Sequence, residues 1–120
     1  MSPVEKLREE FEAHDGSFLF HLRGDLSWDP VAFNRMIGAM LALVQSREPE
    51  DPIPRWIAEG FWFVDWYVKE WSRHPNFPRP FDDRYYERSY ERLHDLAYWL
   101  FMGRSPYESG SHFEPLLPEP

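Results

Sequence analysis

The chain of 120 residues contains no cysteine, which excludes a disulfide framework, a thiolate metal site and a cysteine nucleophile. Basic residues are also scarce, because 13 lysines and arginines stand against 21 aspartates and glutamates and leave a formal net charge of −8 at pH 7. Binding to nucleic acid or to an anionic membrane depends on basic patches, so neither partner is expected. A basic protein is the partner that this charge favours.

Long apolar runs are absent as well. No stretch approaches the roughly 20 apolar residues that cross a bilayer, and the first ten residues lack the hydrophobic core of a signal sequence. We therefore expect a cytoplasmic protein. The length fits one domain with a single core, and an aromatic fraction of 18% argues against general disorder.

Capping residues, prolines and apolar spacing predict an all-α fold, a compact four-helix bundle. The predicted helices run from Pro3 until Asp15-Gly16, from Pro30 to about Ser46, from Pro54 to about Arg73, and from a cap at Asp82 or Asp83 to Met102. Ser2 caps the first helix, Asp29 precedes the second, and Gly103 ends the fourth. We interpret the short apolar segment 17–22, between two glycines, as irregular or extended. Residues 1–103 form the predicted single helical domain, with a stiff proline-rich crossover at 74–81. Residues 104–120 form an extended proline-rich tail, packed on or near the domain through Phe113 and Leu116-Leu117.

The predicted third helix has two apolar faces. Its core-facing stripe, at the spacing of an amphipathic helix, comprises Ile53, Trp56, Ile57, Gly60, Phe63, Val64, Tyr67 and Trp71. Trp62 and Trp66 fall on the opposite side, one turn apart. Such a helix is either a central element covered on both faces or one that offers its second face to a partner. The pattern favours packing of the two indoles, against segment 18–20 or the crossover, over binding.

The binding interpretation rests on carboxylates beside these indoles. Glu59 and Glu70 flank the tryptophan pair, and Asp65 lies close in angle to neither apolar stripe. Together with Trp62 and Trp66 they make a candidate surface for an arginine- or lysine-rich partner, through salt bridges and cation–π contacts. The favoured function is a non-enzymatic acidic binding protein, such as an immunity protein or inhibitor that masks a basic nuclease toxin. A self-associating subunit that forms a homo-oligomer through the same face is an alternative.

The enzymatic alternatives lie on the fourth helix. Arg88 and His94, with five residues between them, match the loose Arg-x(4–6)-His pattern, so this seven-residue segment resembles the active-site motif of HEPN-type ribonucleases, which are small helical bundles. The resemblance implies that these two residues are the catalytic pair. A second enzymatic alternative is a small-ligand pocket between helices, lined by Tyr85, Tyr86, Tyr90 and Tyr98.

Metal and cofactor motifs are missing or incomplete. Glu91-x-x-His94 has the spacing found in di-iron bundles, but those sites need a second copy and two further glutamates. No glycine-rich phosphate loop, Ser/His/Asp order or paired-carboxylate spacing stands out. We therefore expect no metal and no cofactor.

Overall fold

A computed structural model of the chain describes residues 2–107 and 114–119. These ranges hold five α-helices and no strand. In chain order the helices are α1 (Pro3–Phe11), α2 (Phe18–Gly24), α3 (Pro30–Ser46), α4 (Arg55–Ser72) and α5 (Asp83–Met102). The all-helical prediction is confirmed, but the described helices number five where four were expected.

Short polar side chains start most of the helices. Ser2, Ser17, Asp29 and Asp82 each accept a hydrogen bond from a backbone N–H in the first turn of the helix that follows. These bonds satisfy donors that have no partner inside a helix. Gly103 ends α5 in the left-handed conformation, with φ of 74°, as a C-terminal glycine commonly does.

The interpretation of segment 17–22 as irregular or extended is wrong, because it opens helix α2. Ser17 Oγ accepts from the Phe20 N–H at 3.2 Å and starts the helix. Phe18, Leu19 and Leu22 are all buried, one turn or less apart. Five or six residues are too few for periodicity to separate helix from strand, whereas the serine cap is a signal that can be read from sequence.

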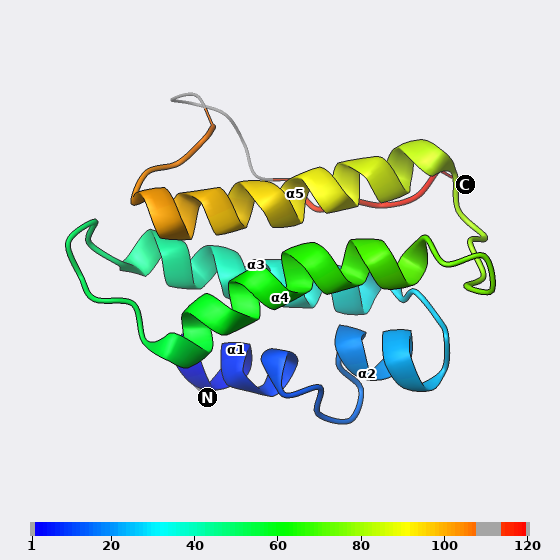
Figure 1. Ribbon diagram of the computed structural model, residues 1–120, viewed down its shortest axis with the longest axis horizontal. Coiled ribbons are helices and arrows are strands. Elements are labelled where there is room, and N and C mark those ends of the chain that lie inside the picture. The colour runs from blue at the N-terminus through cyan, green and yellow to red at the C-terminus, as the bar shows by residue number, and fades with distance from the viewer. Residues whose placement is uncertain (1, 108–113, 120) are drawn as a thin grey trace.

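Helix α5 runs along the molecule and packs against both α3 and α4, and α1 and α2 lie as a second layer below these three helices in the view of Figure 1. Helix α3 packs against α1, α2 and α5, while the main partner of α4 is α5. The largest fully buried side chains come from all five helices and include Leu7, Phe18, Phe33, Phe61 and Tyr86. One continuous core therefore joins the two layers.

The buried stripe of α4 is rotated from the predicted one. Its fully buried apolar side chains are Ile57, Phe61, Val64 and Val68. Phe63, Tyr67 and Trp71 are only half-buried, although they were placed on the core-facing stripe. When almost every position of a helix is apolar, periodicity does not determine which of them face the core.

The crossover between α4 and α5 is attached by aromatic and polar anchors. Phe77 is buried, and Phe81 packs against the core, as expected of both. Arg79 donates to the Ser72 carbonyl and to the Tyr90 hydroxyl, at 3.1 and 3.0 Å, and so joins the end of α4 to α5.

The segment 114–119 is attached to α3. The Asn34 amide donates to the Leu116 carbonyl at 2.9 Å, and its oxygen accepts from the Leu116 N–H at 3.2 Å. The Leu116 side chain is buried, whereas Leu117 is exposed. Phe113, the other predicted anchor of the tail, lies outside the described residues. Within the part of the chain that the structure describes, no helix is long and apolar enough to span a bilayer.

Candidate functional site

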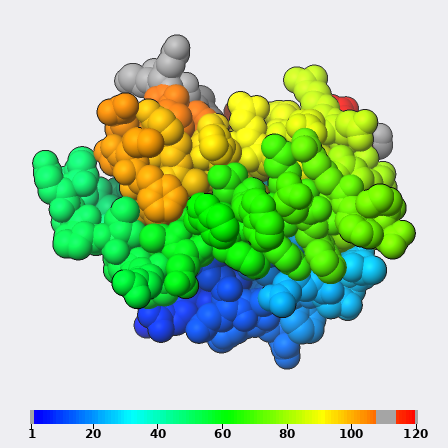
Figure 2. Space-filling model, viewed as in Figure 1, coloured from blue at the N-terminus to red at the C-terminus, as the bar shows by residue number. Residues whose placement is uncertain are grey.

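Two tryptophans lie stacked on the outside of α4. Trp62 and Trp66 are 59% and 52% exposed, and their rings stack with centroids 5.9 Å apart and an interplanar angle of 12°. The other four tryptophans are buried or half-buried. The expectation that this pair packs into the core is therefore wrong, and α4 is not covered on both faces. The exposed side of α4 lies across the middle of the view in Figure 2.

A second row of aromatic rings adjoins the tryptophan pair. Phe63 stacks on Tyr67 at 4.7 Å and Tyr67 on Trp71 at 5.6 Å, each one helical turn from the next. Trp66 lies 6.4 Å from Tyr67 and so connects the two rows. We call these five residues the aromatic face of α4. Stacking of each ring on its neighbours holds the face in one arrangement before any partner binds.

A groove of about 470 Å³ opens beside Trp62, between α1 and α4. Its lining residues are Arg8, Phe11, Glu12, Trp56, Glu59, Gly60, Trp62 and Phe63. Gly60 lets the Phe11 ring pack closely on α4, because a Cβ at this position would lie 2.1 Å from that ring. Carboxylates and aromatic rings therefore line one hollow. No sequence pattern links α1 to this site, since Phe11 and Glu12 reach it only through tertiary packing.

The three predicted carboxylates divide into two kinds. Glu59 and Glu70 are exposed on α4, as a partner-binding role requires. Asp65 instead faces α5, where its Oδ2 lies 3.1 Å from His94 Nδ1. Asp65 thus joins two helices and does not flank the tryptophan pair as a free carboxylate. This contact spans 29 positions and has no signal in the sequence.

A shallow hollow of about 380 Å³ surrounds the contact between Asp65 and His94. It is lined by Asp65, Lys69, Glu87, Tyr90, Glu91 and His94. Three carboxylates against one lysine leave it acidic while the histidine is neutral. It lies on the α5 side of α4, whereas the groove at Trp62 lies on the α1 side. Acidic hollows therefore occur on both sides of the aromatic face.

Arg88 and His94, which the ribonuclease resemblance pairs, are both exposed on α5. In the described ranges, no contact joins these two side chains, and the one that His94 makes is with Asp65. In the neutral histidine, a hydrogen bond from Nδ1 to the carboxylate leaves Nε2 as an acceptor toward solvent. This geometry orients His94 without involving Arg88.

Of the four tyrosines predicted to line a pocket, Tyr85, Tyr86 and Tyr90 are buried in the core, and Tyr98 is half-buried. The Tyr85 hydroxyl accepts from Trp28 Nε1 at 2.8 Å, and the Tyr90 hydroxyl lies 2.5 Å from Ser72 Oγ. The Tyr86 hydroxyl accepts from the Phe81 N–H at 3.4 Å. Burial raises the pKa of both Tyr85 and Tyr86, so these phenols stay protonated at neutral pH. They are structural hydrogen-bonding groups of the core.

The part of the chain that the structure describes holds no group of three or more histidines and carboxylates arranged for a metal ion. No protein-family model, curated protein or solved structure matches this chain.

Proposed function

We propose that this chain is a binding protein that docks a basic protein partner on the aromatic face of α4. The observation that carries the proposal is the exposed stack of Trp62 and Trp66. Tryptophan is among the residues that most often dominate the energetics of protein interfaces. A stacked pair loses little side-chain freedom on binding, because its arrangement is already set.

The charge around the tryptophan pair supports a basic partner. Glu59 and Glu70 flank the pair, and Glu12 joins Glu59 in the groove beside Trp62. The net charge of the whole chain, −8, adds long-range attraction for a positively charged protein. A cationic side chain that enters this groove meets carboxylates and aromatic faces together, which is the combination that binds guanidinium and ammonium groups.

The molecule already stacks guanidinium groups on its own aromatic rings. Arg8 lies 4.5 Å over the Trp56 ring, and Arg79 lies 4.2 Å over that of Tyr86. Across residues 2–107 and 114–119, none lies over Trp62 or Trp66. An arginine-rich partner would supply to these two rings the contact that other rings of the chain receive internally. A basic nuclease masked by an acidic inhibitor is one partner of this chemistry.

Charge reversal tests the proposal. Glu59→Lys/Glu70→Lys changes the candidate surface, and Glu48→Lys/Glu50→Lys makes the same change in net charge at exposed positions of the loop before α4. Tagged parent and variants are recovered from the host, and each co-purified protein is identified and quantified. We expect a basic protein with the parent and the loop variant, and about tenfold less with the surface variant, since close charge pairs at interfaces contribute about 1.5 kcal/mol or more.

Four outcomes would contradict the proposal. Equal recovery of the partner with both variants would show that the interface lies elsewhere on the molecule. An acidic partner would show that charge attraction does not drive the binding. A concentration-dependent dimer that Trp66→Ala abolishes, seen by analytical ultracentrifugation, would assign the aromatic face to self-association. RNA cleavage that His94→Ala removes would support the ribonuclease alternative.

A further inference from the structure

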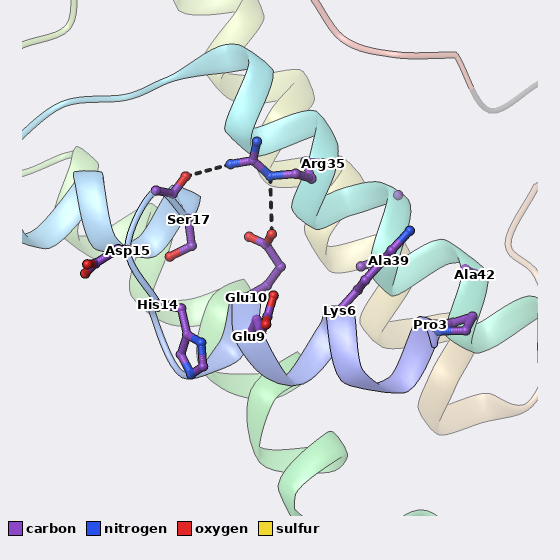
Figure 3. Close-up of a pocket in the computed structure, with 12 residues that line it drawn as sticks. Pro3, Lys6, Glu9, Glu10, His14, Asp15, Ser17, Arg35, Ala39 and Ala42 are labelled. Atoms are coloured by element: carbon purple, nitrogen blue, oxygen red, sulfur yellow. Dashed lines mark hydrogen bonds and ion pairs between the residues drawn. The ribbon is translucent and has the colours of Figure 1, made fainter. Parts of the chain in front are cut away.

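A groove of about 570 Å³ runs between α1 and α3, on surfaces that the proposed function does not use (Figure 3). Its volume is within the range of small-molecule sites. On the α3 side the groove is lined by Arg35 and by an apolar stretch of Gly38, Ala39 and Ala42. Charged side chains of α1, including Lys6, Glu9 and Glu10, form the other wall. An apolar wall opposite a charged one suits a ligand with a polar head and a short apolar tail.

Glu10 is the buried charged group of this groove. Its side chain is 9% exposed, and its carboxylate stands between α1 and α3 in Figure 3. One oxygen, Oε2, lies 3.5 Å from Arg35 Nε. The other, Oε1, is buried and makes no hydrogen bond of ordinary geometry, although the Phe18 backbone N–H lies near enough to the carboxylate to act to lower the pKa of Glu10. A buried carboxylate oxygen without a partner costs free energy, which a hydrogen-bond donor would recover.

Arg35 is held by a backbone carbonyl so that it meets Glu10 at Oε2. Its Nη2 donates to the Gly16 carbonyl at 2.6 Å, which fixes the guanidinium beside the loop between α1 and α2. Its Nε lies on the Oε2 side of Glu10, and the two contacts of Arg35 are the dashed lines of Figure 3. Burial, opposed by Arg35, raises the pKa of Glu10, which shows that this arginine compensates the buried carboxylate only in part.

The charge of the lining indicates the sign of the ligand. The charged residues around the groove are Lys6, Glu9, Glu10, Asp15 and Arg35. Three carboxylates against two cationic groups leave a single negative charge while His14 is neutral. One bound positive charge brings the lining to neutrality, and an anion would add to the excess.

We propose that the α1–α3 groove binds a small organic monocation, a primary ammonium or guanidinium group that donates to Glu10 Oε1 while a short alkyl tail lies on Gly38, Ala39 and Ala42. The ammonium or guanidinium head takes the place of the missing hydrogen-bond donor. The tail covers an apolar wall that no side chain of α1 fills. This site is separate from the aromatic face of α4, and it stands whether or not that face binds a protein.

The test is a titration of the full chain with n-butylammonium at pH 7.5, in which binding is monitored through the amide chemical shifts in two-dimensional NMR spectra. n-Butanol, which has the same tail and no charge, is the control ligand. Glu10→Gln is the test variant, and Glu9→Gln, which makes the same change in charge at a neighbouring lining residue, is its control. We expect saturable shifts at Gly16, Phe18 and Gly38 with the amine. Glu10→Gln should weaken the amine about tenfold or more, as expected for one charge-assisted hydrogen bond, and Glu9→Gln much less.

Several results would overturn the proposal. Shifts that stay linear with amine concentration would show a groove that holds water only. Equal affinity of butylammonium for the parent and for Glu10→Gln would show that the Glu10 carboxylate does not bind the ligand. Butanol that binds as tightly as butylammonium would show that the positive charge does not contribute to binding. Should Glu10→Gln fail to fold, Ala42→Leu is the alternative variant, because its larger side chain fills the groove beside the apolar wall and leaves Glu10 intact. It should weaken butylammonium and spare methylammonium, and equal weakening of both would also contradict the proposal.

Discussion

The packing of α1 on α4 depends on a glycine, and two glycine positions should respond oppositely to the same substitution. Gly60 of α4 lies under the Phe11 ring, and an alanine Cβ there would lie 2.1 Å from Cδ2 and 2.3 Å from Cε2 of that ring. Gly38 of α3 has nothing within 4 Å of the place a Cβ would occupy. Both residues are interior to helices, so alanine gains the same helix propensity at each.

The structure gives the size of each effect. Ordinary contact of a Cβ begins at 3.4 Å, so Cδ2 of Phe11 has to retreat from 2.1 Å to at least that distance before Gly60→Ala is accommodated. Overpacking of this kind costs about 1–3 kcal/mol, and the propensity gain offsets about 1 kcal/mol of it. Gly38→Ala meets no clash and should stabilise the protein by about 1 kcal/mol. The two variants should therefore differ by roughly 1–3 kcal/mol in free energy of unfolding.

Urea unfolding followed by circular dichroism measures both variants against the parent. Gly60→Ala should be less stable than Gly38→Ala, and a second variant, Gly60→Ala/Phe11→Ala, should lose the clash because the ring is gone. Equal stability of the two single variants would refute the reasoning, since it would mean that Phe11 does not lie over Gly60. The reasoning would also be contradicted if the double variant lost more unfolding free energy than Gly60→Ala and Phe11→Ala lose separately when their losses are added.

Three further predictions concern burial, ionisation and the tail. Phe61→Ala should lower the free energy of unfolding by about 3–5 kcal/mol, and Trp62→Ala, at the neighbouring position, by no more than about 1.5 kcal/mol. Equal losses of the two variants in urea unfolding would show that Trp62 is buried. Burial raises the pKa of Glu10, so the folded chain binds the proton of this carboxyl group more tightly than the unfolded chain does. The contribution of Glu10 to the free energy of unfolding therefore falls as the pH rises from the ordinary pKa of 4.5 through the raised value. Glu10→Gln should therefore gain stability relative to the parent across that interval in thermal melts, and a constant difference would contradict the assignment. Asn34→Ala removes two hydrogen bonds to Leu116 and should speed hydrogen exchange at Leu116 with little effect on global stability, whereas an unchanged exchange rate would show that the tail is held by other contacts.

Sequence signals located the longer helices well, because their ends carry strong local chemistry. The caps at Ser2 and Asp29 and the terminal glycine at 103 lie where the sequence places them, and of the two candidate caps of α5 the structure uses Asp82. Ser17 is an equivalent cap, but the apolar run that follows it is too short for its spacing to indicate a helix. A capping serine is thus the more informative signal when a segment is too short to show a period.

The candidate site was predictable in position and not in arrangement. Helical spacing put Trp62 and Trp66 on one side of α4, but their exposure depends on what the rest of the chain covers, which spacing does not contain. Asp65 shows the same limit, because its contact with His94 joins two helices that are far apart in sequence. Side-chain pairs on one helix follow from its period, whereas pairs between helices follow from packing angles that a single sequence does not specify.

The most direct test of the central claim is native mass spectrometry of the parent protein recovered from its host, with Trp62→Ala/Trp66→Ala recovered alongside. The parent should carry one basic protein at fixed stoichiometry, and the variant should be folded, as judged by its charge-state distribution, and bare. A parent that carries no protein partner, or a partner that the folded variant retains, would contradict the claim that the aromatic face of α4 is the binding surface.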